Sequence, residues 1–331
     1  MLTLQPMAVT LTYIQDQLRP ELDALSTIIS QTLKSNSELT NSIVTNYLKS
    51  KGKMLRPIVA LLSAKFFGGI NEKARQGAAA LELLHNASLI HDDIIDEATE
   101  RRGLPTINSV WSNHVAVLVG DFFVTGALRC GVATGDSRIL SALADMGRDL
   151  SLGEIDQVDI ARNRNIDEAI YMDIIRDKTA SLFECCAAVG GYANDASPEA
   201  IDEMRRYARL LGLCFQIKDD TFDYYHNPII GKPTGNDLRE GKITLPLIYA
   251  LGRTDLPEHD EMLQLVRKEN LSSEDIDRLI NFAKEAGGID YAYQTMKRLR
   301  DEAAQILAPH AQNDTVKEFM DIFDYVIERK L

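Results

Sequence analysis

The sequence predicts an all-α fold, and three observations support this prediction. Segments with apolar residues at a 3.6-residue period follow one another along the 331 residues. Glycine and proline are sparse and fall mainly between these segments. Neither Asn-Gly nor Asp-Gly, the strongest hairpin signals, occurs anywhere. Helices are expected at roughly 11–34, 55–67, 71–96, 119–134, 137–160, 166–189, 198–225, 242–252, 273–286, 288–308 and 314–329.

Several helix ends carry recognisable signals. Gly68 and Gly69 follow an apolar segment and predict a helix end. Asn165 followed by Glu168 is typical of a capping box. Ser197-Pro198 places proline at the first position of a helix. These signals support separate helices within one bundle.

Composition indicates a soluble globular chain with one domain, residues 1–331. The chain has 45% hydrophobic and 26% charged residues, which argues against disorder. No composition shift marks a domain boundary, and the one long Pro/Gly-containing loop, residues 226–241, is typical of a functional lid. The net charge of −13 argues against a nucleic-acid-binding surface.

The location expected for the chain is the cytoplasm. The four cysteines form no CxxC pair and lie in apolar helical segments, which predicts buried free thiols. The first twenty residues show no basic segment followed by an apolar one, so no secretory signal is expected. Charges interrupt the apolar runs, so no transmembrane span is expected either.

Two short acidic elements share the pattern D-D-x-x-D inside helical segments. They are LIHDDIIDEA at 89–98 and QIKDDTFDYY at 216–225. Helical positions i and i+4 lie about 5–6 Å apart, so the first and last aspartates of each element share a face. Adjacent carboxylates raise one another's pKa unless a cation lies between them, and oxygen ligands suit Mg²⁺ that bridges to phosphate. The elements predict facing Mg²⁺–phosphate sites built from Asp92, Asp93, Asp96, Asp219, Asp220 and Asp223.

Basic side chains accompany these elements in an otherwise acidic sequence. Arg101 and Arg102 follow the first element, and the arginine fork matches phosphate oxygens. Lys53 and Arg56 lie at an expected helix start, where the helix dipole also favours an anion. The other candidates for the same site are Lys178, Thr179, Lys232, Lys242 and His85.

Taken with these residues, the chain resembles the trans-isoprenyl (polyprenyl) diphosphate synthase family. The motifs GKMLRP, ELLHNASLIHDDIIDEATERRG, VGDFF, GEIDQ, KTASLF, FQIKDD and GKPTGNDLREGKITLPL carry the resemblance, in the family's order, between residues 51 and 247. It implies a single large helical bundle of the isoprenoid synthase type around a deep central cavity. It also implies Mg²⁺-dependent head-to-tail condensation of isopentenyl diphosphate with an allylic diphosphate, giving an all-trans polyprenyl diphosphate.

The resemblance assigns a role to each matching residue. The six aspartates match the two motifs that hold two to three Mg²⁺ ions on the allylic diphosphate. Contacts to that diphosphate are implied for Arg101, Lys178, Thr179, Gln216, Lys232 and Lys242. The pocket for isopentenyl diphosphate is implied for Lys53, Arg56, His85 and Arg102. Gln157 matches a polar residue near the metal waters, and Met54 is a departure, because the family often has arginine there.

Product length is expected to depend on the residues below the first acidic element. Ser88 lies one turn below Asp92, with Ala87 beside it. In the family, bulky aromatic residues at these two places close the cavity after short products. Both residues are small here, which favours a medium or long chain of seven to ten isoprene units by family analogy, as for a quinone side chain. The next candidates for a floor are Leu81, Leu84, Phe122 and Phe123.

Four alternatives remain open at this point. A geranylgeranyl or farnesyl diphosphate synthase would share the whole site, and a terpene cyclase would lack the second diphosphate pocket. A non-catalytic regulatory subunit would carry a damaged acidic element, whereas both are intact. An acidic helical scaffold would need no basic partners. The family also implies a homodimer, and a long lipid product implies transient membrane contact for release.

Overall fold

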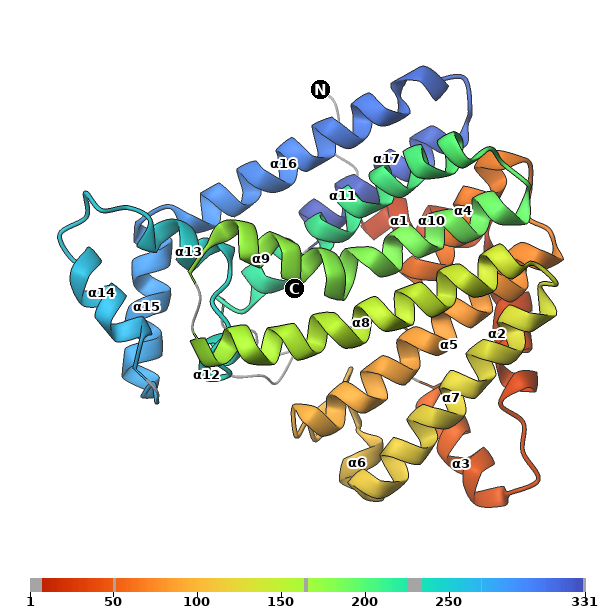
Figure 1. The fold of residues 1–331 in the computed structure, drawn as a ribbon, viewed down its shortest axis with the longest axis horizontal. Coiled ribbons are helices and arrows are strands. Elements are labelled where there is room, and N and C mark those ends of the chain that lie inside the picture. Colours follow the sequence, from red (N-terminus) through yellow and green to blue (C-terminus); the bar gives the residue numbers. More distant parts are fainter. Residues whose placement is uncertain (1–7, 50–51, 164–165, 226–233, 269, 330–331) are drawn as a thin grey trace.

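The computed structural model describes residues 8–49, 52–163, 166–225, 234–268 and 270–329, and its regular structure is almost entirely helical (Figure 1). The first half contains α1 (Ala8–Gln17), α2 (Arg19–Thr32), α3 (Glu38–Tyr47), α4 (Leu55–Phe67), α5 (Glu72–Ile95), β1 (Glu100–Arg101), β2 (Leu104–Pro105), α6 (Ile107–Val110), α7 (Asn113–Ala133) and α8 (Ser137–Asn163). The second half contains α9 (Glu168–Ile175), the π-helical turn η1 (Arg176–Ala180), α10 (Ser181–Ala193), α11 (Pro198–Phe222), α12 (Asn236–Arg239), α13 (Leu245–Leu251), α14 (His259–Val266), α15 (Ser273–Glu285), α16 (Gly288–Leu307), η2 (Ala308–His310) and α17 (Thr315–Glu328). The predicted all-α fold is confirmed.

The centre of the bundle is formed by α4, α5, α10 and α11. Helix α10 is apolar on nearly every side and is buried along almost its whole length. It approaches α4 closely, because a Cβ on Gly190 would lie 2.4 Å from the backbone nitrogen of Ala64. The four cysteines are buried and free, as predicted. In Figure 1, α8 crosses in front of this core and α16 borders it, while α14 and α15 stand apart at the left.

Helix α7 bears on the expectation that no segment spans a membrane. Among the described residues it is the one helix whose length and apolar composition would allow it to cross a membrane. Two charges, Asp121 and Arg129, nevertheless interrupt Asn113–Ala133, as expected from the sequence. Less than half of its most apolar window, 44%, is buried, and the buried face packs against α5. The apolar residues of α7 therefore lie on the face that packs against α5 and also on the face that is exposed.

Local chemistry explains where the sequence-based boundaries hold and where they fail. The predicted helix 11–34 is split after Gln17, and Pro20 lies in the first turn of α2. Helices α3, α6, α12 and α14 were not predicted, since they are short. The hairpin of β1 and β2 was also missed, because its turn residues are Arg102 and Gly103, with φ values of 54° and 75°.

Helix ends follow the predicted signals in two of three cases. Gly68 ends α4 with a φ of 154°. The Ser197 side chain accepts from the backbone N–H of Ala200 at the start of α11. The predicted cap at Asn165 is wrong, because α9 begins after Asp167, whose carboxylate accepts from two backbone N–H groups. Asn165 itself lies outside the described residues.

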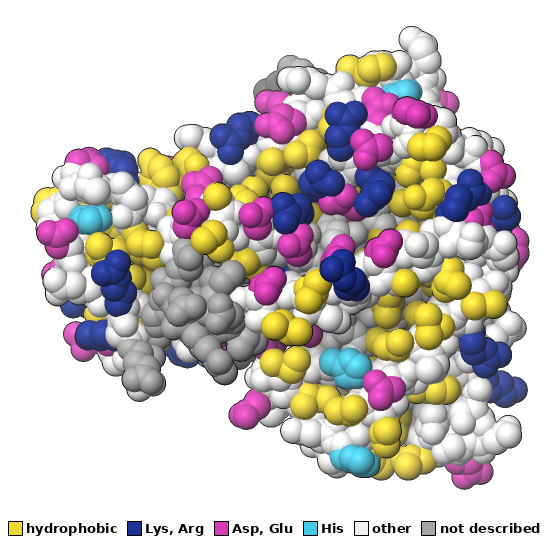
Figure 2. Space-filling model, in the orientation of Figure 1, with side chains coloured by type: hydrophobic (Ala, Val, Ile, Leu, Met, Phe, Trp, Pro, Cys, Tyr) yellow, Lys and Arg dark blue, Asp and Glu magenta, His cyan; other side chains and the backbone are white. Residues whose placement is uncertain are grey.

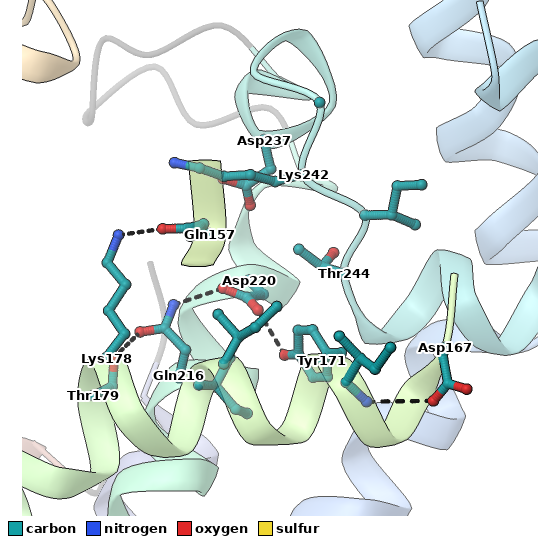
Figure 3. A pocket seen from close by; sticks show the side chains of 15 residues that line it. Gln157, Asp167, Tyr171, Lys178, Thr179, Gln216, Asp220, Asp237, Lys242 and Thr244 are labelled. Carbon is teal, nitrogen blue, oxygen red and sulfur yellow. Dashed lines mark hydrogen bonds between the residues drawn. The ribbon is translucent and has the colours of Figure 1, made fainter. Parts of the chain in front are cut away.

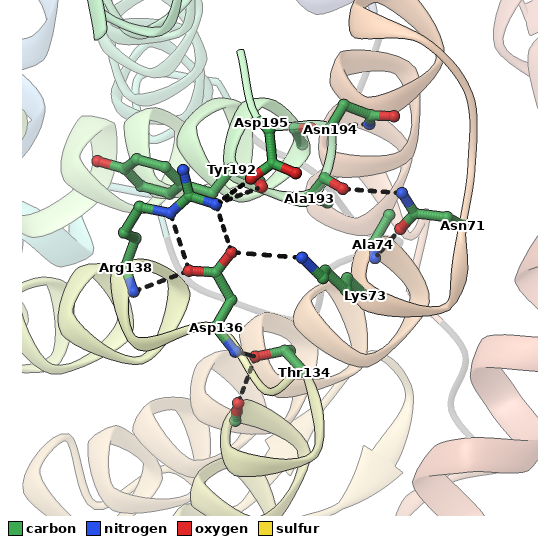
Figure 4. A network of polar contacts seen from close by, with 12 residues as sticks. Asn71, Lys73, Ala74, Thr134, Asp136, Arg138, Tyr192, Ala193, Asn194 and Asp195 are labelled. Atoms are coloured by element: carbon green, nitrogen blue, oxygen red, sulfur yellow. Dashed lines mark hydrogen bonds and ion pairs between the residues drawn. The ribbon is translucent and has the colours of Figure 1, made fainter. Parts of the chain in front are cut away.

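A polar network ties together the ends of α5, α8 and α10 away from the acidic elements (Figure 4). Arg138 donates to Asp136 Oδ1 and Oδ2 at 2.9 and 2.6 Å, and to Asp195 Oδ1 at 2.5 Å. Lys73 of α5 lies 3.7 Å from Asp136. These bonds lower the pKa of Asp136 to about 2. The network fixes the start of α5, the start of α8 and the end of α10 relative to one another.

Candidate active site

The second acidic element lies at the end of α11, with its central carboxylate buried beside a cavity (Figure 3). Asp220 Oδ2 accepts from the Tyr171 hydroxyl at 2.6 Å, and Oδ1 accepts from Gln216 Nε2 at 2.7 Å. Burial raises the pKa of Asp220 to about 6, and the bonds from Tyr171 and Gln216 oppose this shift. The Asp220 carboxylate is therefore oriented by neutral donors. Because its pKa is about 6, a cation that binds the carboxylate would displace the proton.

The other two aspartates of this element have different partners. Arg329 donates to Asp219 Oδ1 at 2.6 Å. Asp223 accepts from the backbone N–H groups of Asn236 and Asp237 at 2.9 and 3.0 Å, so it fixes the start of α12. Burial raises the pKa of both carboxyls. The metal-binding role of Asp223 stays a prediction, and the structure adds an anchoring role for the loop that carries Asp237.

Lys178 and Thr179 project from η1, the π-helical turn between α9 and α10. Lys178 Nζ donates to Gln157 Oε1 and pairs with Glu154, each at 2.5 Å. Thr179 donates to Gln216 Oε1 at 2.7 Å, which continues the chain of bonds to Asp220. A π-turn inside a helix often marks a functional site. The turn also approaches α8 closely, since a Cβ on Gly153 would lie 3.1 Å from the Lys178 nitrogen.

The first acidic element ends α5. Burial raises the pKa of Asp92 to about 6, the Lys178 charge opposes this shift, and the carboxylates of Glu154 and Asp96 add to it. Asp93 is buried and accepts from Arg101 Nε at 2.7 Å. Asp96 is exposed and forms the C-cap. The charge of Lys178 therefore acts on the first element, while the adjacent Thr179 begins the bonded chain that leads to Asp220.

Lys242 lies between the two elements at the mouth of the cavity. Burial lowers its pKa, but the Glu240 carboxylate at 2.5 Å and the charges of Asp237 and Asp96 raise the pKa of Lys242 overall. Asp237, a residue that the sequence analysis missed, has a pKa raised by burial and by Asp220 and Asp223. Lys232 and loop residues 226–233 lie outside the described residues.

One cavity collects many of the predicted residues. It has a volume of about 130 Å³. Aliphatic side chains of α9 line it together with polar groups from α8, η1, α11 and the segment 237–244 (Figure 3). The predicted residues that line it are Gln157, Lys178, Thr179, Gln216, Asp220 and Lys242. Tyr171 was not foreseen, because its partner Asp220 lies 49 residues away in the sequence. Asp237 was not foreseen, because it lies in α12, a helix that was not predicted.

A second basic group surrounds the start of α4. His85 is buried and Arg56 is partly buried, and the pKa of each is lowered by burial first, with Arg102 adding to the shift. His85 is therefore neutral near pH 7. The Arg102 guanidinium lies against Gly52, where a Cβ would be only 2.7 Å from its Nη1. Glu82, which the sequence analysis missed, is buried nearby, and burial raises its pKa against Arg56 and Arg102.

The predicted chain-length residues fall into two groups. Ser88, Leu84 and Phe122 keep part of their surface accessible. Leu84 lies opposite a wall without a side chain, since a Cβ on Gly147 of α8 would be 3.7 Å from Leu84 Cδ2. The completely packed members are Ala87, Leu81 and Phe123, and Phe123 packs edge-on against Tyr47 with ring centroids 5.4 Å apart.

The donor chemistry of the acidic elements fits Mg²⁺. All six side chains are carboxylates, the ligands that hard divalent cations prefer. Within the described residues, no three Asp, Glu, His or Cys side chains converge closely enough to form a complete ligand set. A bound ion would therefore take its remaining ligands from diphosphate oxygens and water.

A helical bundle with paired acidic elements and separate groups of cations is the arrangement expected of an enzyme that acts on diphosphates. The sequence profile described as "Polyprenyl synthetase" matches residues 37–283. The chain belongs to the polyprenyl synthetase family and is a prenyltransferase. The predicted family and enzyme class are thereby confirmed.

Individual relatives agree with this assignment. The all-trans-nonaprenyl-diphosphate synthase (geranyl-diphosphate specific) of Rhodobacter capsulatus is 35% identical, over 88% of this chain and 91% of its own length. The octaprenyl diphosphate synthase of Escherichia coli K12 is 31% identical over 87% and 88%. A polyprenyl synthase from Caulobacter crescentus, solved with calcium and isoprenyl diphosphate, superposes with a TM-score of 0.89 at 29% identity, over 97% and 98%. Names of other relatives include geranylgeranyl diphosphate synthase.

Proposed function

We propose that the chain condenses isopentenyl diphosphate head-to-tail with an allylic diphosphate and releases an all-trans polyprenyl diphosphate. The observation that carries the proposal is the separation of two cation groups around the aspartates. Lys178 and Lys242 lie beside the acidic elements, whereas Arg56, His85 and Arg102 cluster at the start of α4. An enzyme that binds two diphosphates needs two groups of cations, whereas a terpene cyclase, which binds one diphosphate, needs only one group.

The acidic elements are proposed to hold two or three Mg²⁺ ions on the allylic diphosphate. Bound Mg²⁺ would neutralise the charge that builds on diphosphate as it leaves. Lys178, Thr179 and Lys242 would bind the same diphosphate oxygens and orient the allylic carbon. The neutral His85 would donate to the second diphosphate beside Arg56 and Arg102.

The rest of the cavity would protect an allylic cation. Ile170, Ile174 and Ile175 line the wall beside Asp220 and keep water away from the reacting carbon. The double bond of isopentenyl diphosphate would attack that carbon, and the released diphosphate would take the proton that is lost. This chemistry needs no side-chain nucleophile.

The product is proposed to be a medium or long chain of about seven to ten isoprene units, by analogy with family members that have small residues at these positions. Small Ser88 and partly accessible Leu84 and Phe122 support an open path beneath Asp92. A geranylgeranyl diphosphate synthase is the second candidate, since relatives of that name exist. A regulatory subunit is disfavoured because both acidic elements are intact.

The assembly is proposed to be a cytoplasmic homodimer of one-domain subunits. One hydrophobic core runs from Leu11 to Ile327, which supports a single domain. Exposed apolar side chains gather over the lower right of the face in Figure 2, where α7 lies in Figure 1. Those of α7 are Val117, Leu118, Leu128 and Val132, with exposed fractions of 43–65%. Such a stripe supports an interface between two copies.

Transient membrane contact is proposed at a cleft beside the hairpin. Lys49, Arg101 and Arg102 line one part, and Leu104, Val110 and Trp111 line another, around about 320 Å³. Lys49, the cation of this cleft that is not assigned to a diphosphate, lines it together with these apolar side chains, and this combination suits an anionic lipid surface. Trp111 is the chain's single tryptophan, so anionic vesicles should shift its fluorescence to the blue, and an unchanged spectrum would refute the contact.

One assay tests the function. Purified protein is incubated with Mg²⁺, isopentenyl diphosphate and farnesyl diphosphate, and the prenyl product is sized. Elongation beyond twenty carbons is expected. A product that stops at twenty carbons would refute the long chain and leave the geranylgeranyl alternative, whereas no elongation would refute the proposed reaction.

A further inference from the structure

Arg329, the residue after α17, makes an ion pair with an aspartate of the second acidic element. Its Nη2 donates to Asp219 Oδ1 at 2.6 Å and to the Phe215 carbonyl at 3.1 Å. The Arg329 side chain is only 8% exposed, whereas that of Asp219 is 38% exposed. An arginine buried on this scale, 110 residues from its partner, is held in one place by the fold.

Aromatic rings fix the guanidinium of Arg329 in place. It lies 4.2 Å from the Phe215 ring centroid and 5.3 Å from that of Phe222. Arg56 of the second basic group lies 5.4 Å from the same Phe215 ring. The Nε atom of Arg329 is buried without a hydrogen-bond partner among the described residues. The aromatic stack and the pair with Asp219 thus account for its position.

We propose that Arg329 is a positioning residue that orients Asp219 for metal binding. The one bond from Arg329 to Asp219 falls on Oδ1, which leaves Oδ2 to face a cation. The inference rests on the proposed function, because it requires Mg²⁺ at this element.

Each aspartate of the element is held by a different kind of donor. Asp220 accepts from side chains of Tyr171 and Gln216, and Asp223 accepts from backbone N–H groups. Asp219 is the member that is held by a cation. Partners that orient a ligating carboxylate typically change metal affinity by 10- to 100-fold when they are removed. An effect of that size on the metal is the signature that separates positioning from mere packing.

The test measures metal binding without turnover. Mn²⁺ binding in the presence of inorganic diphosphate is followed by electron paramagnetic resonance for wild type, R329Q and R329K. We expect R329Q to weaken binding of one class of Mn²⁺ by about 10- to 100-fold. R329K, which keeps the charge but loses the planar fork, should fall between them. The Mg²⁺ concentration for half-maximal rate should rise from wild type to R329K to R329Q.

R300Q is the matched control. Arg300 makes a similar pair with Asp324 at 2.8 Å between α16 and α17, so its loss should leave Mn²⁺ binding unchanged. Wild-type Mn²⁺ binding in R329Q, with or without a lower melting temperature, would overturn the positioning role and leave the proposed function intact. Failure of the wild type itself to bind Mn²⁺ with diphosphate would overturn both. If R329Q does not fold, R329K decides between these outcomes.

Discussion

The Tyr171 hydroxyl donates to Asp220 Oδ2 across 2.6 Å, and both side chains are buried. Tyr171 belongs to α9 and Asp220 to α11, so the bond joins two walls of the cavity in Figure 3. It stabilises the charged carboxylate against the effect of burial. The bond therefore bears on how readily Asp220 takes a metal ion.

Tyr171→Phe removes this bond while keeping the ring. Without the donor, the pKa of Asp220 should rise further and its orientation should relax. We expect the apparent affinity for Mg²⁺ to fall by about 10- to 100-fold, measured as the Mg²⁺ dependence of the initial rate. Tyr291→Phe is the control, because Tyr291 donates to Glu168 at 3.0 Å outside the cavity. Equal Mg²⁺ dependence in both variants would contradict a role for the Tyr171 bond.

Metal affinity should fall steeply below about pH 6. The pKa values of Asp92 and Asp220 are both raised to about 6 from the usual 3.8, chiefly by burial. Metal requires the charged form, so Mg²⁺ binding must release protons near and below that pH. A calorimetric titration in buffers of different ionisation enthalpy measures the protons released. No release at pH 5.5–6 would show that the two carboxyls are already ionised.

The same shifts give the metal-free enzyme an opposite pH dependence. A raised carboxyl pKa favours protons in the folded state, so these two groups reduce stability as pH rises from about 4 to about 6. Above about pH 6, the loss of folding stability that these two groups cause is complete. Thermal unfolding with and without Mg²⁺ should therefore diverge as the pH rises, because the ion stabilises the charged form of the buried carboxylates in the folded state. Parallel curves would contradict this.

Periodicity alone predicted the fold class and much of its detail. The α4 segment 55–67 was predicted with its observed ends, because its apolar run is followed directly by Gly68, a typical helix terminator. The turn η1 was not predicted, since no sequence signal that was used separates a π-helical turn from the α-helical turns on either side of it. The hairpin escaped because its turn is Arg-Gly, where Arg102 adopts a positive φ that sequence rules reserve for Asn or Asp.

For the candidate site, sequence predicted the chemistry but not its supports. Lys178, Thr179 and Gln216 were carried over from a family resemblance; Thr179 does bond to Gln216, whereas the neighbouring Lys178 bonds to Gln157. Tyr171 and Arg329 were missed, because their bonds to the second element span 49 and 110 residues. Such pairs arise from tertiary packing, and a single sequence carries no local signal for them.

Ser88→Phe should shorten the product. Ser88 is half-buried one turn below Asp92, and its hydroxyl donates to the His85 carbonyl. A phenyl ring there would fill the space below the first acidic element. Product sizing after incubation with both substrates should show loss of the longest chains. Gln76→Phe, on the outer part of the same helix, is the control, and an unchanged product in Ser88→Phe would refute the floor argument.

Asp136 and Asp255 both have a pKa of about 2, but their substitution should change the free energy of unfolding by different amounts. Asp136 lies in the network of Figure 4 with a side chain 7% exposed, whereas Asp255 pairs with Arg253 in an exposed turn. Asp136→Ala removes the acceptor shared by Arg138 of α8 and Lys73 of α5 and should lower the free energy of unfolding by about 1–3 kcal/mol. Asp255→Ala should leave it unchanged, because water replaces the partner. Denaturant unfolding at pH 7 measures both.

The pH dependence of the Asp136 contribution has a definite sign. The folded pKa, about 2, lies below the usual 3.8, so the contribution is fully present above about pH 4 and is lost as pH falls through about 2. The stability difference between wild type and Asp136→Ala should therefore shrink across that window. A constant difference down to pH 2 would show that packing, rather than charge, holds the three helix ends.

Charge on the exposed face of α7 should separate the proposed dimer. Leu118 and Val132 are 56% and 65% exposed and belong to the apolar stripe of that helix. Leu118→Glu together with Val132→Glu would place unpaired charges in the centre of an interface, where they lose hydration without a partner. Light scattering should then report the mass of one 36.9 kDa chain. Tyr13→Glu, on the exposed side of α1, should leave the mass unchanged. A dimer that survives the double substitution would place the interface on another face.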